Sequence, residues 1–467
     1  MQRQRLTDGT VLVATCFVVL IVYSPTLIYP YLLADETWLV RPNAWGWTLP
    51  MGRPGFSVFA FLAQLIHSTL GFEAVIYAMR ISAIVALGWS GWLMCLWFER
   101  WGHSRLVSWS IAVSMLTLPA FQIVVADGTQ LAYSMLATVL SIRAFDRGFE
   151  ARNWKSLLWS AFLLYGALTI YQQQALVFFA LLAVPLLMHS RELSTYKYVV
   201  SSGVFVVAVS VIYFVSWRAM YRLVWPDRLD TRYGPDAVGL PGLEVLDAFV
   251  TNRLVQVANL WDVSHPDFGW ITAVIAILVL VCAAMIIRQS TWRAPLAIGL
   301  LVGLLVATDA FRLVAGAYPS YVTATALSMC VFYLAVAPVA CSRFGHYAAP
   351  LVLCLGAGFA FFTVKEVAYD NWRHDTIVRE AMLANPEGRS LHIVGHSRSD
   401  DYQEFSWQNA GNDYYVSITA SNIAEDLIRQ GKLTEAPKVS VGEPIAIIDW
   451  AKIPHEPAPE AIVVVLD

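Results

Sequence analysis

The sequence predicts an α-helical polytopic membrane protein, and three observations carry that prediction. Hydrophobic residues make up 58% of the chain, and only 14% of its residues are charged. Apolar runs of membrane-spanning length recur along the chain, more of them than the core of a water-soluble protein needs. The short segments between these runs are rich in arginine at every second connection. A transmembrane β-barrel would instead show short segments of alternating hydrophobicity.

Eleven segments are predicted as transmembrane helices. The first follows the basic start Met1–Arg5, and Tyr23-Ser24-Pro25-Thr26 is not a small-residue cleavage site. We therefore expect an uncleaved first span rather than a signal peptide. The predicted spans are residues 11–32, 74–97, 105–122, 128–145, 156–171, 173–189, 198–217, 269–287, 294–309, 319–340 and 347–364.

The basic residues of the short connections predict the orientation of these spans. The tight connections near Asp127 and Tyr171 contain no arginine or lysine, and the connection 310–318 contains only Arg312. Arginine and lysine are enriched in cytoplasmic loops, so we expect these three connections outside the cytoplasm and the N-terminus inside. The expected inner connections contain Arg100, Arg105, Arg143, Arg147, Arg152, Lys155, Arg191, Lys197, Arg288, Arg293 and Arg343.

The two long outer connections each contain a helical pattern. In the connection 33–73, residues 56–67 are apolar but too few to span, which predicts an interfacial helix lying in the outer membrane surface. In the connection 218–268, residues 243–261 have apolar side chains at helical spacing. We expect this second helix to pack over the outer end of the bundle.

The composition changes after residue 370 and predicts a small C-terminal α/β domain outside the cytoplasm. We divide the chain into a transmembrane domain, residues 1–368, and this small domain, residues 369–467. The segments expected in the second domain are strands at 391–396, 414–418, 445–450 and 461–466 and a helix at 424–429.

Polar residues gather at the outer ends of the predicted spans. Asp35 and Glu36 follow the first span, and ionised side chains at a membrane boundary need water, a counterion or a function. Arginine matches phosphate oxygens well, and a carboxylate can accept the proton of a hydroxyl nucleophile. The set therefore predicts group transfer from a phosphate leaving group to an alcohol in an outward-facing cavity. Its other members are Arg53, Arg80, Asp127, Tyr171, Gln172, Gln173, Gln174, Asp309 and Arg312.

Structural alternatives exist for these residues. Arg80 could form an ion pair with Asp127 or Glu73, and Arg312 could be an interfacial anchor. The segment 171–174 could supply hydrogen bonds between helices. The acidic pair after the first span could simply begin a solvated loop.

Charge and cysteine usage exclude other classes. The net charge of −3 argues against a nucleic-acid partner. The six cysteines all lie in or beside apolar segments, so we expect no disulfide and no cysteine-based metal site. The 18 tryptophans suit interfacial belts and a sugar site.

An apolar first span followed by Asp35-Glu36, in an outer loop with an interfacial helix, resembles the GT-C class of lipid-phosphate-sugar-dependent glycosyltransferases. More specifically, the chain resembles the bacterial glucosyl transferase II family over residues 11–340. The aromatic residue expected just before Asp127 is absent, and the segment after residue 370 has no counterpart. The matching motifs are Gly52-Arg53, Leu118-Pro119-Ala120-Phe121, Thr169-Ile170-Tyr171-Gln172 and Arg312.

The resemblance implies transfer of a hexosyl unit, glucosyl, from a polyprenyl-phosphate sugar to a cell-envelope glycan such as lipopolysaccharide O-antigen. The reaction would take place on the extracytoplasmic face of the bacterial inner membrane, in contact with the lipid bilayer. We expect no cofactor, and no metal because arginines already bind the phosphate. The implied roles are Asp35 as general base with Glu36 orienting or replacing it, Arg53, Arg80 and Arg312 as phosphate ligands, and Asp127, Tyr171, Gln172 and Trp38 at the sugar or the acceptor.

Two other classes remain open. A transporter or flippase of a lipid-linked sugar would show paired repeats and helices broken near the midplane, and the sequence shows neither. A scaffold for an envelope-synthesis complex would use the C-terminal domain to bind a partner.

Overall fold

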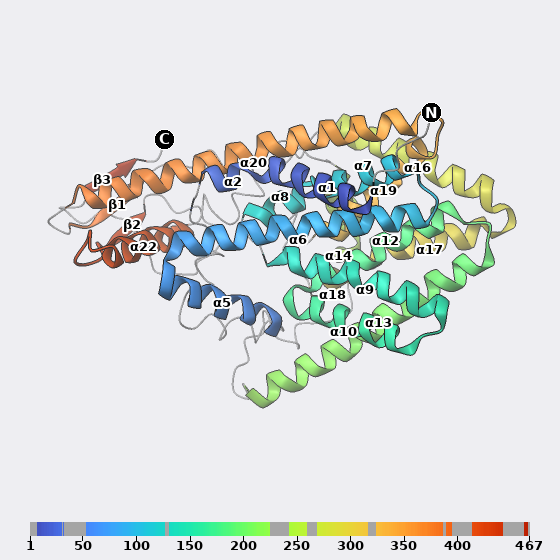
Figure 1. The fold of residues 1–467 in the computed structure, drawn as a ribbon, viewed down its shortest axis with the longest axis horizontal. Helices are drawn as coiled ribbons and strands as arrows, with labels where there is room; N and C mark the ends of the chain where they lie inside the picture. The colour runs from blue at the N-terminus through green and yellow to red at the C-terminus, as the bar shows by residue number, and fades with distance from the viewer. Residues whose placement is uncertain are drawn as a thin grey trace.

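The computed structural model describes residues 7–29, 31, 53–126, 130–224, 242–258, 269–315, 324–385, 389–394, 413–441 and 462–465. These residues form a long bundle of helices with a small sheet at one end (Figure 1). The N-terminal helix begins at the opposite end from the sheet, and α20 runs along the bundle to reach it.

Helices account for nearly all of the described bundle, and each of the eleven predicted apolar segments overlaps at least one of them. The helices are α1 (Asp8–Tyr23), α2 (Pro25–Ile28), α5 (Pro54–Leu70), α6 (Phe72–Arg100), α7 (Arg105–Met115), α8 (Pro119–Ala126), α9 (Leu131–Ala151), α10 (Trp154–Ile170), α11 (Gln172–Ala175), α12 (Val177–Met188), α13 (Leu193–Val224), α14 (Leu243–Ala248), α15 (Leu254–Ala258), α16 (Gly269–Ser290), α17 (Ala294–Ala307), α18 (Ala310–Ala315), α19 (Thr325–Ala340) and α20 (Gly345–Leu383).

Length and composition support a membrane-embedded protein. Among the described residues, four helices are long and apolar enough to cross a bilayer, and five further apolar helices have 10–17 residues. The apolar stretch of α6 is 67% buried and that of α16 only 17%. Helix α6 is therefore central, and α16 presents most of its apolar surface to the surroundings. The full number of eleven spans stays a prediction.

Helix α1 packs closely against α6 because glycine occupies the contact. A Cβ atom added at Gly88 would lie 2.6 Å from Cys16 Sγ and 3.1 Å from Cys16 Cα. One at Gly91 would lie 2.8 Å from Thr15 Cγ2. Small residues allow such close helix approach within membranes, where packing rather than the hydrophobic effect drives association.

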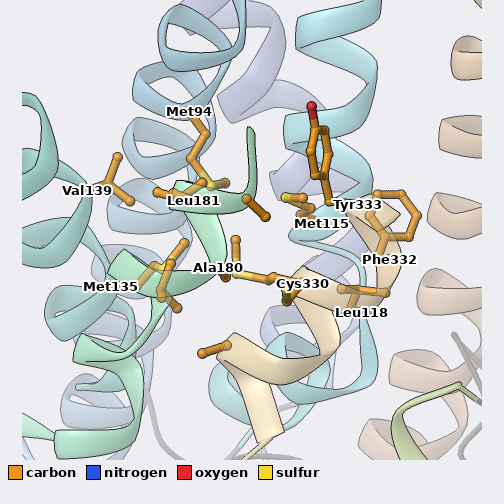
Figure 2. Packing of buried hydrophobic residues seen from close by; sticks show 14 of the residues in the cluster. Met94, Met115, Leu118, Met135, Val139, Ala180, Leu181, Cys330, Phe332 and Tyr333 are labelled. Atoms are coloured by element: carbon orange, nitrogen blue, oxygen red, sulfur yellow. The ribbon is translucent and has the colours of Figure 1, made fainter. Parts of the chain in front are cut away.

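The centre of the bundle is an apolar core in which several helices meet (Figure 2). Met94 of α6 and Met135 of α9 lie on one side of it, and Phe332 and Tyr333 of α19 on the other. Methionine fills irregular gaps between helices well because its side chain is unbranched and flexible. Among the described residues, this core links the sequence-distant helices α6, α9, α12 and α19.

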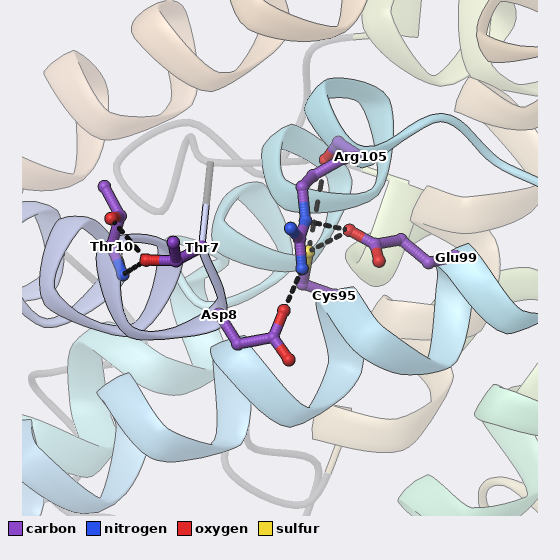
Figure 3. A network of polar contacts seen from close by, with 6 residues as sticks. All are labelled: Thr7, Asp8, Thr10, Cys95, Glu99 and Arg105. Carbon is purple, nitrogen blue, oxygen red and sulfur yellow. Dashed lines mark hydrogen bonds and ion pairs between the residues drawn. The ribbon is translucent and has the colours of Figure 1, made fainter. Parts of the chain in front are cut away.

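Several ion pairs lie at the end of the bundle where α1 begins. Arg105 contacts Asp8, and its Nε donates to Glu99 Oε1 at 2.8 Å (Figure 3). Arg100 Nε lies 2.7 Å from Asp146 Oδ2. These contacts join the start of α1 and the ends of α6 and α9 at the end of the bundle that the basic connections predict to be cytoplasmic.

At the other end, the predicted spans are broken. The first predicted span is interrupted at Ser24-Pro25 and the third between Met115 and Pro119, while Tyr171 separates α10 from α11 at the connection that the sequence predicts. Proline accounts for both breaks, because it has no N–H to donate within a helix.

The C-terminal region contains a three-stranded parallel sheet in the order β2 (Val439–Val441), β1 (Leu391–Val394), β3 (Ile462–Val465). The expected strand at 414–418 is wrong, because these residues belong to helix α22 (Asp413–Arg429). The side chains of Ala420, Ile423, Ala424 and Leu427 are buried on one face of that helix, so packing decided the conformation of a run too short to distinguish strand from helix.

The other predicted elements of the C-terminal region agree with the structure in part. Strands β1 and β3 and the end of α22 lie where the sequence predicts them, whereas β2 was not predicted. The segment 445–450 lies outside the described residues. The boundary expected after residue 368 falls inside α20, which continues without a break to Leu383.

The region rests on the ends of α5, α6 and α20. Phe72 and Ile76 of α6 share a buried cluster with Met382 and with residues of β1 and α22. Arg429 donates to the His67 carbonyl oxygen at 2.6 Å, and Arg379 Nη1 lies 3.1 Å from Asp426 Oδ2.

The glycine contact between α1 and α6 can be tested by adding bulk. Gly88→Leu should lower the unfolding free energy by about 1–3 kcal/mol, because overpacking forces the helices apart. Gly203→Leu on α13 is the matched control, since nothing lies within 4 Å of an added Cβ there. Thermal unfolding in detergent measures both variants, and equal melting temperatures would contradict the contact.

A second prediction concerns His103, in the connection between α6 and α7. Burial lowers the pKa of His103 to about 4 from its usual 6.5, and its Nε2 lies 2.9 Å from the Tyr333 hydroxyl. The unfolded chain binds a proton below pH 6.5 that the folded chain resists, so stability present above pH 6.5 is lost as the pH falls toward 4.

The melting temperature measured between pH 7.5 and 5 should therefore fall less steeply in His103→Gln than in the unchanged protein. His346→Gln is the control, because His346 lies at the same end of the bundle but is exposed. A slope unaltered by the first substitution would show that His103 does not contribute.

Candidate functional site

Four of the nine predicted site residues have described side chains. Asp35, Glu36, Trp38 and Asp127 lie outside the described residues. Arg312 lies in α18, and only its backbone position is described. The remaining four, Arg53, Arg80, Tyr171 and Gln172, all lie at the end of the bundle where the spans are broken.

Three of these residues meet although they are far apart in the sequence. The guanidinium carbon of Arg53 lies 4.4 Å from the centre of the Tyr171 ring. Arg53 Nε donates to Gln172 Oε1 at 3.4 Å. Arginine over an aromatic face is attracted by the ring and remains charged, so a cation is held at this point.

The local sequence explains why these residues approach. Pro54 begins α5 directly after Arg53, a position that a helix offers to proline because no N–H is needed there. A Cβ atom at Gly55 would lie 2.7 Å from Thr169 Oγ1 and 2.9 Å from Ile170 Cγ1. Only glycine allows the start of α5 to lie against the end of α10, which brings Arg53 to Tyr171.

Tyr213 of α13 extends the group and was not predicted. Its hydroxyl accepts a hydrogen bond from Gln172 Nε2 at 2.7 Å, and its side chain is buried. The nearby hydroxyl of Tyr165 lies 2.8 Å from Ser216 Oγ. A tyrosine and a serine within one apolar span were the sequence signal, because buried hydroxyls in membrane helices need partners.

Arg80 has a different environment from Arg53. Its side chain is fully buried, and it donates to the carbonyl oxygens of Thr26 at 2.7 Å and Tyr31 at 3.0 Å. The guanidinium carbon also lies 4.1 Å from the Tyr31 ring centre. Arg80 therefore fixes the chain where it leaves α2, four residues before Asp35.

A buried ion pair at the same end was also missed by sequence reasoning. Arg253 Nη2 lies 3.5 Å from Asp309 Oδ1, and both side chains are fully buried. Arg253 ends η2 (Phe249–Arg253), a π-helical turn between α14 and α15, and π-turns are frequent at functional sites. Asp309 was noted among the polar residues, but the partner helix had been assigned only a packing role.

Four glutamine side chains near this end are buried, and their amide oxygens accept no hydrogen bond from the described part of the chain: Gln122, Gln130, Gln173 and Gln174. Gln174 Nε2 donates to Thr325 Oγ1 at 2.8 Å, which directs α11 toward the start of α19. Buried acceptors of this kind are rare in native proteins and can accept hydrogen bonds from water or from hydroxyl groups of a ligand.

The described residues contain no group of three or more histidine, cysteine, aspartate or glutamate side chains that could hold a metal ion. A cavity of about 140 Å³ lies at the other end of the bundle and is lined by residues of α12, α16 and α19. It is separate from Arg53, Tyr171, Gln172 and Tyr213, which we call the Arg53 group.

Comparison with known proteins adds no assignment. No protein-family model matches this chain, and no curated protein matches it.

The buried ion pair provides a testable prediction. Asp309→Asn should lower the unfolding free energy by about 3–5 kcal/mol, because it leaves the Arg253 charge buried without its carboxylate. Glu150→Gln is the matched control: Glu150 also pairs with an arginine, Arg100, but is exposed, so about 0–1 kcal/mol is expected. Thermal unfolding in detergent measures both, and equal shifts would contradict the prediction.

Proposed function

We propose that this protein is a polyprenyl-phosphate-sugar-dependent glycosyltransferase that moves a hexosyl unit, glucosyl, to a cell-envelope glycan on the extracytoplasmic face of the bacterial inner membrane. The observation that carries the proposal is the Arg53 group. A guanidinium, an aromatic ring and an amide come together there from two sequence-distant segments, at the end of the bundle opposite its basic connections.

The chemistry of the Arg53 group suits a phosphate leaving group. Guanidinium N–H groups donate to phosphate oxygens, often in pairs, and the Tyr171 ring holds the guanidinium from one side. Negative charge grows on the phosphate as the bond to the sugar breaks. A cation already fixed at that position stabilises the transition state without reorganisation.

Helix α5 suits the lipid part of such a donor. Ala60 and Ala63 are buried against the bundle, while Val58, Phe61 and Leu65 are exposed. An apolar helix face beside the phosphate-binding arginine lets an isoprenoid chain lie against the protein while its phosphate reaches Arg53.

A transfer reaction of this kind also needs a base for the acceptor hydroxyl, and two carboxylates are candidates. Asp35 is proposed as the general base on the acceptor hydroxyl, with Glu36 orienting or replacing it. Arg80 is fixed by backbone carbonyls just before these residues, so we assign it a positioning role in addition to the predicted contact with phosphate. Arg312, Asp127, Gln172 and Trp38 stay predictions for the phosphate and the sugar.

A transporter or flippase of a lipid-linked sugar is the second candidate, and one observation favours it. Two predicted spans are interrupted, at Ser24-Pro25 and between Met115 and Pro119, and broken helices are common in transporters. The transferase remains the first candidate, because Arg53, Tyr171 and Gln172 meet at one end of the bundle rather than along a path through it.

The two candidates differ in their response to loss of the carboxylate. Asp35→Asn should abolish transfer of hexose from a polyprenyl-phosphate hexose in membranes, because an amide cannot accept the acceptor's proton. Arg53→Gln should lower the rate about 100-fold or more, comparable to loss of an electrostatic group at a transition state. Mass spectrometry of the glycan product with and without each variant is the measurement.

Lys155→Gln is the control, since Lys155 lies on α10 at the opposite end from Arg53. Normal protein levels with undiminished hexose transfer in the double variant Asp35→Asn, Glu36→Gln would overturn the transferase proposal, because neither carboxylate could then act as the base. Glycans that lack no hexose when the gene is absent would do the same.

A further inference from the structure

A second candidate site lies at the basic end of the bundle. The cavity of about 140 Å³ is lined by Met188 of α12, by Cys282, Met285 and Gln289 of α16, and by Ala337 and Cys341 of α19. Helix α12 runs from the Tyr171 segment to Met188, so the cavity and the Arg53 group are separated by about 18 Å of helix.

The walls of this cavity are apolar. Apart from the Gln289 amide, its side chains are aliphatic or contain sulfur, and Cys341 Sγ lies 3.6 Å from Met188 Sδ. An engineered cavity of similar size, about 150 Å³ and lined by apolar groups, stays dry and takes up apolar ligands. The part of a ligand that enters here is therefore a few carbon atoms without polar groups.

One arginine contacts a residue that lines the cavity, and three more lie close to it in the structure or in the sequence. Arg191 Nε donates to the carbonyl oxygen of Gln289, a lining residue, at 2.9 Å. Arg293 Nη1 in turn donates to the Arg191 carbonyl oxygen at 2.7 Å. Arg288 precedes Gln289, and Arg343 follows Cys341 by two residues.

Most of the donors on these arginines remain available. A guanidinium has five N–H donors. Arg191 and Arg293 each use one of them in the bonds above, and within the described part of the chain Arg288 and Arg343 form no hydrogen bond or ion pair. The nearby carboxylate of Glu192 contacts a histidine instead of these arginines: Glu192 Oε1 lies 3.0 Å from His189 Nδ1.

The cavity lies at the depth of a membrane interface. Trp292 is 79% exposed beside it, with the Arg293 guanidinium 4.8 Å from its ring centre. Exposed tryptophan marks the headgroup level of a bilayer, and the apolar surface of α16 continues from there toward the membrane centre. A ligand at this position has one end in the headgroup region and the other in the hydrocarbon.

We propose that this cavity and its four arginines bind an anionic phospholipid of the leaflet at the basic end of the bundle. An acyl chain occupies the apolar cavity, and the phosphate accepts hydrogen bonds from the guanidinium groups. Basic pockets between membrane helices recognise anionic headgroups in this way. The inference does not depend on the reaction carried out at the Arg53 group.

The test uses the thiol that lines the cavity. The full-length protein is reconstituted in nanodiscs of phosphatidylglycerol or of phosphatidylcholine with the same acyl chains, and modification by a maleimide is followed by peptide mass spectrometry. Cys341 should react several times more slowly in phosphatidylglycerol. Cys354 is exposed on α20 within the predicted span 347–364, so it faces acyl chains in both lipids and should react little in either.

Arginine variants test the headgroup contact. Arg288→Gln and Arg343→Gln should each reduce the protection of Cys341 roughly fivefold, the effect expected for one basic residue near an anionic surface. These two side chains are exposed, so their loss should not unfold the protein. Lys155→Gln removes the same charge at the same end, away from α12, α16 and α19, and should leave the protection unchanged.

Two further arms identify the ligand. Ala337→Leu fills the cavity and should lower the number of phosphatidylglycerol molecules retained in native mass spectrometry, whereas glycerol phosphate alone should not protect Cys341. Equal Cys341 rates in the two lipids, with equal retention of both, would overturn the proposal. Protection that requires cuprous ion instead would also overturn it, and would assign the two thiols and two thioethers to a soft metal.

Discussion

The rest of this structure depends on how the backbone groups at buried helix ends find hydrogen-bond partners. In an apolar interior, each backbone group released where a helix stops must find another partner. Arg80 donates to Thr26 and Tyr31, Gln122 donates to the Thr117 carbonyl oxygen at 2.9 Å, and Ser134 Oγ lies 2.9 Å from the carbonyl oxygen of Ala167. Polar side chains therefore gather where the helices break, and this end of the bundle is the one suited to chemistry.

The same constraint explains why the two ends of the bundle differ. At the basic end, charged residues such as Arg105 and Glu99 pair with each other or are exposed, and the helices there are not interrupted within the described residues. At the broken end, the charges of Arg80, Arg253 and Asp309 are completely buried. Buried charges are costly unless bonded, so their retention there is a stronger indication of function than the exposed arginines at the other end.

The candidate site was predictable in part, and the reasons differ by residue. Arg53, Tyr171 and Gln172 were identified because polar residues at the end of an apolar run are unusual. Tyr213 and Arg253 were missed. Tyr213 lies within an apolar span, and Arg253 lies on the helix predicted at 243–261, for which we expected only packing over the outer end of the bundle. Neither position differs in sequence from an ordinary helix residue until its neighbours are known.

Hydrophobic periodicity and run length by themselves determined that this chain is helical, apolar enough for a membrane and charged at alternate connections, because those properties depend only on residues close in sequence. They could not determine the helix α22 in place of a strand at 414–418, since a five-residue run satisfies both patterns. Only tertiary structure decided which polar residues meet, because Arg53 reaches Tyr171 through a contact that the glycine at position 55 permits across more than a hundred residues of chain.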